Sequence, residues 1–126
     1  MRVASGPPAM GTVLVDLVKG LKDITAVAVV GFDGMVIDQC TSEPDVNLDL
    51  ISVGHTSLIK QAVTFLRDSN GGEPTELILT TSRQKLVARL VAKEYFLLII
   101  LRPEASLGQA RHVACRAGAL LEAELR

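Results

Sequence analysis

Few residues of this chain have the types and spacing that catalysis or metal binding requires. The two histidines, His55 and His112, belong to no HExxH motif, and the two cysteines, Cys40 and Cys115, lie far apart without a CxxC pair. No GxSxG elbow supplies an activated serine. His55 lies in an apolar helical stripe, which favours a core or interface histidine over a catalytic one. We therefore predict no metal, no cofactor and no catalytic residue. The two cysteines are predicted to be buried and reduced. Residues that are distant in the sequence could still form a nucleophile–base pair in the folded chain.

Pairs of glycines and aspartates are better interpreted as turns than as binding sites. Gly71 and Gly72 follow a predicted helix and precede a predicted strand, whereas a phosphate-binding loop runs from a strand to a helix. Asp33 and Asp38 flank a predicted hairpin turn and could form a pair of acids. Asp-Gly is a common turn signal, however, and Asp38 suits a solvated strand end, so we favour turn structure.

The charges of the chain are nearly balanced. Thirteen basic against fourteen acidic residues give a net charge of −1, which creates no long-range field toward nucleic acid or an anionic membrane. Aromatic residues make up only 3%, which leaves little surface for base stacking, so we predict no nucleic-acid partner. One basic cluster indicates either a contact with an acidic partner or, as we favour, a solvated face with edge-protecting charge. Its members are Arg83, Lys85, Arg89 and Lys93.

Length and composition indicate one globular domain. The chain has 126 residues, of which 48% are hydrophobic and 21% charged. The longest apolar run, residues 95–101, is far shorter than the roughly 20 residues of a membrane-spanning helix. No secretory signal core is present, so we expect a cytoplasmic protein without membrane insertion. Residues 1–11 contain two adjacent prolines and are predicted to be a flexible lead-in to a domain of residues 12–126.

Hydrophobic periodicity predicts eight elements in the order α-β-β-α-β-β-β-α. Their residue ranges are 12–21, 24–31, 35–40, a long helix from 46 or 48 to 68, 76–81, 85–91, 95–101 and a final helix after Pro103. The connections between strands are short, which favours an antiparallel sheet. The runs 24–31 and 95–101 are apolar on both faces, so they require helices on both sides of the sheet. We predict a three-layer α/β/α sandwich.

The long second helix has more apolar surface than one contact with a sheet requires. One stripe is predicted to cover the sheet: Leu48, Ile51, His55, Leu58, Ile59, Ala62, Phe65 and Leu66. A neighbouring flank of mostly small side chains could admit a second helix: Leu50, Gly54, Ser57, Gln61 and Thr64. One helix can therefore serve two interfaces.

The order of the elements and several local stretches resemble the roadblock/dynein light chain family, and within it the bacterial MglB-type proteins. The resemblance extends from about Val13 to Leu125. It depends on the hairpin VVGFDGMVID, on DVNLDLIS at the start of the long helix, and on the ending ILRPEASLGQARHVACRAGALL, in which SLGQAR is the most specific piece.

This resemblance implies a profilin-like fold with a five-stranded antiparallel sheet. It also implies a homodimer in which the second helices lie against each other and the third strands join the two sheets. The expected dimer residues are Leu50, Gly54, Ser57, Leu58, Gln61, Ile78 and Thr80. Family members bind small GTPases or act as adaptors without catalysing a reaction themselves. The residues expected to contact a Ras-like GTPase are Val53, Thr56 and Lys60.

The MglB-type proteins activate their GTPase by reshaping it, without donating an arginine finger. If this chain stimulates GTP hydrolysis, we therefore expect the catalytic groups to come from the GTPase. Two alternatives remain at this point. The chain could be a structural adaptor that does not respond to the nucleotide, as in dynein light chains, or a small-molecule sensor with a pocket against the sheet.

Overall fold

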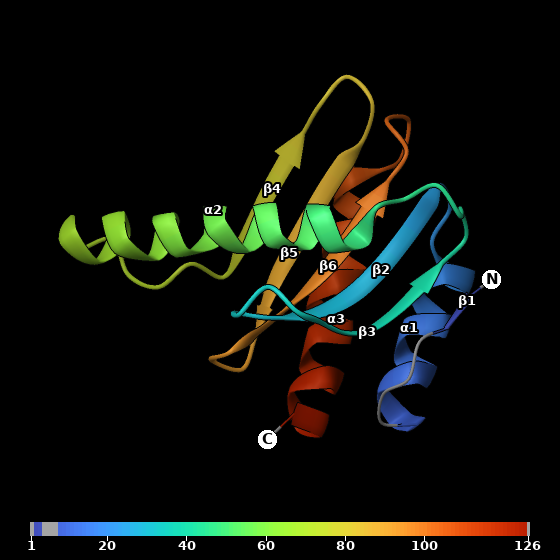
Figure 1. Cartoon of the computed structure of the whole chain (residues 1–126), viewed down its shortest axis with the longest axis horizontal. Helices are drawn as coiled ribbons and strands as arrows, with labels where there is room; N and C mark the ends of the chain where they lie inside the picture. The colour runs from blue at the N-terminus through green and yellow to red at the C-terminus, as the bar shows by residue number, and fades with distance from the viewer. Residues whose placement is uncertain (1, 4–7, 126) are drawn as a thin grey trace.

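The computed structural model describes residues 2–3 and 8–125, and it shows three layers around one sheet (Figure 1). The elements are β1 (Arg2–Val3), α1 (Pro8–Gly20), β2 (Ile24–Gly31), β3 (Val36–Thr41), α2 (Leu48–Asp68), β4 (Glu76–Thr80), β5 (Lys85–Val91), β6 (Tyr95–Leu101) and α3 (Leu107–Leu125). The strands lie in the order β1-β3-β2-β6-β5-β4, and each neighbouring pair is antiparallel. Helix α2 covers one face of the sheet, and α1 and α3 cover the other. The predicted α/β/α sandwich and its five antiparallel strands are confirmed.

The N-terminal boundary differs from the one predicted. Within the expected lead-in of residues 1–11, Arg2–Val3 form strand β1, which pairs with the end of β3, and α1 begins at Pro8 rather than near residue 12. Proline suits the first turn of a helix, where its missing N–H has no partner to lose. Met10 is fully buried, which anchors this turn against the core. The rest of the lead-in, residues 1 and 4–7, lies outside the described residues.

The core depends on two strands that are buried on both faces. Every residue of β2 is buried, and so is every residue of β6 after Tyr95. On the side of α2 the sheet presents the small side chains of Ala26, Ala28 and Ala88, which let the helix lie close to the backbone. On the other side, larger side chains such as Val27 and Leu97 fill the space below α1 and α3.

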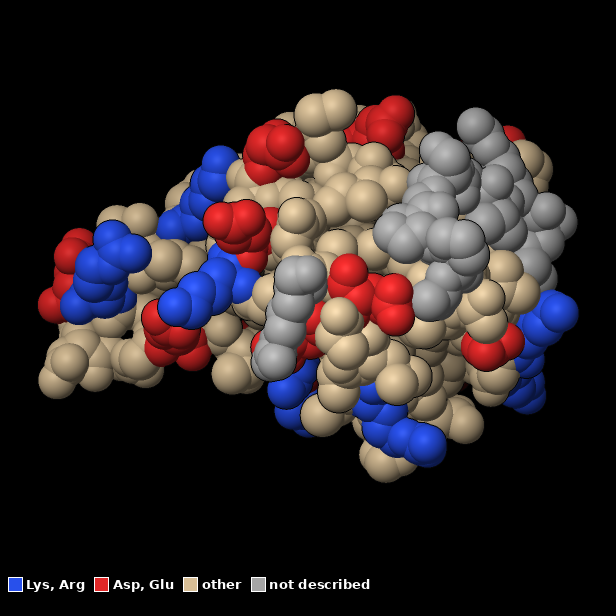
Figure 2. Space-filling model, turned by 90° about the horizontal axis from the view of Figure 1, so that it is seen from below, with Lys and Arg blue, Asp and Glu red and all other residues tan. Residues whose placement is uncertain are grey.

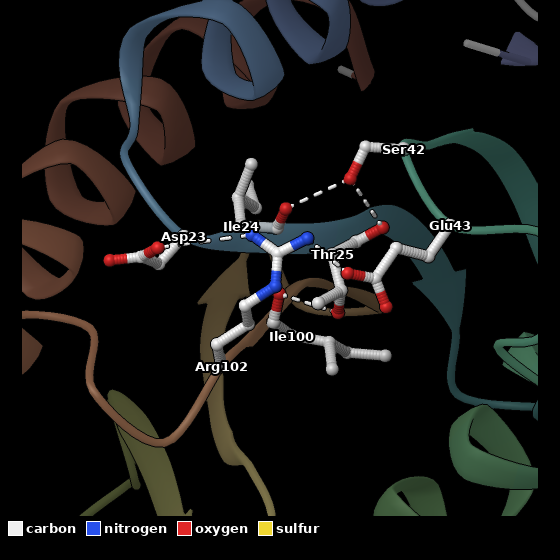
Figure 3. A network of polar contacts seen from close by, with 7 residues as sticks. All are labelled: Asp23, Ile24, Thr25, Ser42, Glu43, Ile100 and Arg102. Atoms are coloured by element: carbon white, nitrogen blue, oxygen red, sulfur yellow. Dashed lines mark hydrogen bonds and ion pairs between the residues drawn. The ribbon is translucent and has the colours of Figure 1, made fainter.

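A polar cluster closes one end of the sheet, where β2 begins and where β3 and β6 end (Figure 3). The Arg102 guanidinium contacts the carboxylates of Glu43 and, at 3.8 Å, Asp23. The Ser42 hydroxyl donates a hydrogen bond of 2.9 Å to the carbonyl oxygen of Ile24. These contacts join three strand ends that lie far apart in the sequence.

The two aspartates of the β2–β3 hairpin have different environments. The Asp33 carboxylate accepts a hydrogen bond of 3.0 Å from the Met35 N–H, so Asp33 belongs to the turn, as predicted. Asp38, predicted at a solvated strand end, is instead only 1% exposed, and its Oδ2 lies close to Gly11 of α1. Its Oδ1 accepts a bond from Gln39, but Oδ2 has no hydrogen-bond partner among the described residues. Burial raises the pKa of the Asp38 carboxyl, and the Gln39 N–H opposes this shift.

The raised pKa of Asp38 predicts a pH-dependent gain in stability for Asp38→Asn. The folded chain binds the Asp38 proton more tightly than the unfolded chain does. The wild-type free energy of unfolding therefore decreases as pH rises from the ordinary aspartate pKa through the raised one. Asparagine cannot ionise, so we expect the variant to be more stable than the wild type at pH 7 by about 1 kcal/mol.

Urea unfolding at pH 7 and at pH 3.5 measures this effect, with the exposed Asp45→Asn as the matched control. The advantage of Asp38→Asn should become small at the lower pH, where Asp38 of the wild type is protonated. A variant that is less stable than the wild type at pH 7 would contradict the prediction.

Candidate protein-interaction site

Helix α2 is only partly supported by the sheet below it. Its buried residues are Leu48, Ser52, His55, Thr56 and Ile59, so full burial ends two turns before the helix does. Figure 1 shows the reason: the C-terminal part of α2 extends beyond the sheet at the edge formed by β4. Within residues 2–3 and 8–125, no strand of the sheet lies beneath this segment.

The predicted sheet-facing stripe of α2 is correct at some positions and wrong at others. Leu48, His55 and Ile59 are buried as predicted, but Leu58 and Phe65 are 41% and 60% exposed. At about 100° per residue, Leu58 and Phe65 lie roughly a quarter of a turn from the direction that faces the sheet. Ser52 and Thr56, which the stripe omitted, occupy that direction instead.

The outer side of α2 presents an apolar surface to solvent. Leu50 is 68% exposed and Val53 is 56% exposed, in addition to Leu58 and Phe65. A Cβ atom at Gly54 would find no other atom within 4 Å, so the backbone is accessible at this position. Apolar side chains concentrated on one exposed helix face are typical of an interaction site.

Strand β4 forms an open edge of the sheet on the same side of the molecule. Among the described strands it pairs only with β5, and Leu79 and Thr80 are exposed on it. The N–H and C=O groups on its outer side can pair with another strand. Two arginines hold β4 in place through Glu76: Arg111 Nε of α3 donates a bond of 2.8 Å to Glu76, and Arg89 lies 4.0 Å from it.

The structure brings most of the expected dimer residues to this surface. Five of them are exposed along α2, namely Leu50, Gly54, Ser57, Leu58 and Gln61. Thr80 is exposed on β4, whereas Ile78 is half-buried and packs against the core below α1 and α3.

Of the three residues expected to contact a GTPase, only Val53 and Lys60 are exposed. Thr56 is 4% exposed, and its hydroxyl donates a bond of 2.7 Å to the carbonyl oxygen of Ser52. Thr56 nevertheless lines a hollow beside α2, so its contact with a GTPase stays a prediction. Its polar side chain is compatible with burial because the helix itself supplies the hydrogen-bond acceptor.

A surface hollow lies between α2 and the β2–β3 turn. Asp33 and Gly34 of the turn line it together with Val53, Lys60 and other α2 residues, among them the expected dimer residues Ser57 and Gln61. Gly34 has a φ of +86°, and a Cβ there would lie 3.4 Å from Val53, so a small residue allows the turn to approach the helix. Met35, which follows this turn, is 68% exposed and was not among the expected site residues.

The buried side of α2 carries polar groups that serve no visible catalytic arrangement. His55 is 2% exposed, and its ring centroid lies 6.1 Å from that of Phe96. Burial lowers the pKa of His55, and the Leu77 backbone opposes this shift, so burial favours the uncharged form of the ring. Among the described residues, His55 Nε2 and Ser52 Oγ have no hydrogen-bond partner. The prediction of a core histidine is confirmed.

Other chemical groups are dispersed. Cys40 is buried as predicted, but Cys115 is exposed. The described part of the chain contains no group of three or more His, Cys, Asp or Glu residues that could hold a metal ion. In the basic cluster around β5, Lys85 donates to the Ala105 carbonyl oxygen at 2.8 Å and Arg89 faces Glu76. On the face shown in Figure 2, acidic and basic side chains alternate rather than forming a patch of one sign.

None of the helices within residues 8–125 combines the length and the hydropathy needed to span a membrane.

Comparison with known proteins identifies the fold. No family model and no curated protein matches the chain in sequence. Among solved structures, Myxococcus xanthus MglB is similar with a TM-score of 0.85 and 15% identity, covering 94% of this chain and 95% of MglB. A Roadblock/LC7 domain from Streptomyces avermitilis is similar with a TM-score of 0.82 and 16% identity, covering 96% of this chain and 98% of that domain. MglC from Myxococcus xanthus has a TM-score of 0.66 and 27% identity, covering 92% of this chain and 98% of MglC. With the same three layers and nearly complete coverage in both directions, the chain has the Roadblock/LC7 fold in the form found in MglB.

Proposed function

We propose that the chain is a homodimeric regulator or scaffold that binds a Ras-like small GTPase and has no catalytic residues of its own. The observation that carries this proposal is the exposed apolar side of α2, which continues beyond the sheet to the open edge at β4. Exposure of this apolar surface to water raises the free energy of the single chain, and such a surface typically marks a site that another protein covers.

A two-fold axis beside β4 would bring the exposed side of α2 and the open edge of β4 into contact with their copies in a second subunit. Two β4 strands would pair along their free edges, and the two sheets would become continuous. The overhanging part of each α2 would then lie over the other subunit rather than over solvent. Leu50, Gly54 and Leu58 would meet their own copies, and the exposed backbone at Gly54 would allow the helices to approach closely.

The GTPase contact is assigned to the hollow between α2 and the β2–β3 turn. Val53 and Lys60 lie there beside the β2–β3 turn, and Met35 adds an exposed apolar side chain next to it. The support for a GTPase partner is the resemblance to MglB-type proteins together with the MglB-like fold. The expected dimer residues Ser57 and Gln61 also line this hollow, so in the proposed dimer the GTPase contact would adjoin the contact between subunits.

Two arginines beside β4 are poor candidates for an arginine finger, whereas the exposed Arg83 and Arg116 are tested by substitution below. Arg89 and Arg111 are already paired with Glu76, so their guanidinium groups hold β4 against α3. An arginine finger must instead be able to reach the transferred phosphoryl group. The GTPase would therefore supply the catalytic groups.

Gly54→Arg is predicted to separate the subunits. A long charged side chain at the centre of the helix contact would have to be buried without a partner, which weakens association by at least about a hundredfold. Light scattering at about 20 µM measures the mass. Gly108→Arg is the matched control, because a Cβ at Gly108 also finds open space but lies on α3. A wild-type chain of monomer mass under these conditions would contradict the proposed dimer.

Charge reversal at Lys60 is predicted to weaken GTPase binding while leaving the dimer intact. Lys60→Glu and Val53→Glu should each weaken the complex about tenfold or more, whereas Lys22→Glu should have little effect. Binding is measured with a Ras-like GTPase of the same organism, loaded with GDP or with a non-hydrolysable GTP analogue.

The same assay separates a regulator from an adaptor. Preference for one nucleotide state indicates a regulator, because only differential affinity can shift a conformational equilibrium. Equal binding of both states would favour the structural adaptor instead.

Alanine at Arg83, Arg89, Arg111 or Arg116 should leave the hydrolysis rate at saturation within about tenfold, while removal of an arginine finger costs 10³–10⁵. Loss of stimulation with normal binding in any of these variants would overturn the proposed mechanism.

A further inference from the structure

The face of the molecule opposite α2 has a second apolar hollow. Helices α1 and α3 lie side by side below the sheet (Figure 1), and their side chains line a groove. The floor of the groove consists of the buried side chains of Leu17 and Ala117, and its walls are the half-buried Val13 and Val113. The groove lies on the face of the sheet opposite α2, so it shares no lining residue with the proposed α2 contact.

The two helices contribute to this groove with the same spacing. Positions 13, 16, 17 and 20 of α1 and positions 113, 116, 117 and 120 of α3 line it. This i, i+3, i+4, i+7 pattern gives each helix a stripe along two turns. A groove between two parallel ridges of this kind accepts further helices, as in a four-helix bundle.

The charges on the rims of the groove are complementary across it. Asp16 is exposed on the α1 rim, and Arg116 is exposed on the α3 rim. Within the described part of the chain, neither side chain forms an ion pair. Leu120 is 60% exposed on the α3 rim, although it belongs to the apolar stripe.

We propose that this groove is a second self-association surface, in which α1 of each copy packs against α3 of the other. A two-fold axis along the groove exchanges the positions of the two rims. Asp16 of each copy then faces Arg116 of the other, which gives two equivalent ion pairs from one pair of residues. The exposed Leu120 side chains are covered by the opposing α1. The same surface thus recognises a second copy of this chain through matching charge and matching apolar surface.

We expect this contact to be weak because the surface is small. Two turns from each of four helices bury less than a standard interface of about 1,600 Å². The surface therefore joins copies at high local concentration rather than forming an obligate unit. If the α2 dimer also forms, the two surfaces together allow pairs of dimers.

Charge reversal provides a sharp test, carried out in the Gly54→Arg background so that the α2 contact does not contribute. Asp16→Arg and Arg116→Asp should each weaken self-association about tenfold or more, since each places like charges opposite each other twice. An equimolar mixture of the two variants should restore association, because both contacts between unlike copies are then attractive. Sedimentation velocity from about 20 µM to 1 mM measures the effect.

Control variants reverse charges outside the groove. Lys22→Glu and Glu124→Lys should leave self-association unchanged, and Leu120→Glu should abolish it without rescue by mixing. Circular dichroism verifies that each variant folds. The Gly108→Arg chain keeps its α2 surface intact and therefore shows whether the α2 dimer forms. Absence of the α2 dimer can thus be distinguished from absence of the groove contact.

Three results would overturn the inference. The first is a Gly54→Arg chain that remains monomeric up to 1 mM. The second is a mixture of Asp16→Arg and Arg116→Asp that associates no better than either variant alone. If Leu120→Glu leaves self-association unchanged, the groove is not the contact between copies, and a helix of another protein becomes its candidate occupant.

Discussion

The complete burial of strands β2 and β6 is the constraint on which the rest of the structure depends. All residues of β2 are buried, and β6 is buried from Phe96 to Leu101. A sheet whose central strands are apolar on both faces must be covered on both faces. This requirement places α1 and α3 on one side and α2 on the other, so each helix has an inner side fixed by the core and an outer side available for other contacts.

The length of α2 then creates the candidate interaction site. A helix of 21 residues is about 30 Å long, whereas the five strands from β3 to β4 span about 20 Å. The helix begins over the β3 side of the sheet and therefore extends past β4. The apolar residues of this overhang, such as Phe65, lose the layer that would otherwise bury them. An exposed apolar helix end beside an open strand edge follows directly from this mismatch in length.

The two faces of the sheet differ in how firmly their helices are attached. Below α2, the buried polar groups of Ser52 and His55 reduce the gain from apolar burial, because an unpaired polar atom costs about 1–3 kcal/mol. Leu48 and Ile59 supply the apolar anchors of this helix. The opposite face is apolar apart from Asp38. The surface that is proposed to bind partners thus belongs to the helix with the more polar attachment.

The sequence by itself determined the element order, the antiparallel sheet and the three layers, because these depend on periodicity and on turn signals that act over a few residues. It also predicts a second contact for α2 besides the one with the sheet. Only the tertiary structure decided which residues of α2 face the sheet. The pattern ranked Leu58 and Phe65 as buried and overlooked Ser52 and Thr56, since apolar character alone fixes neither the rotation of a helix nor the place where its supporting sheet ends. The same limit hid the burial of Asp38, the start of α1 at Pro8 and the pairing of β1 with β3, because each depends on neighbours brought together by the fold rather than by the chain.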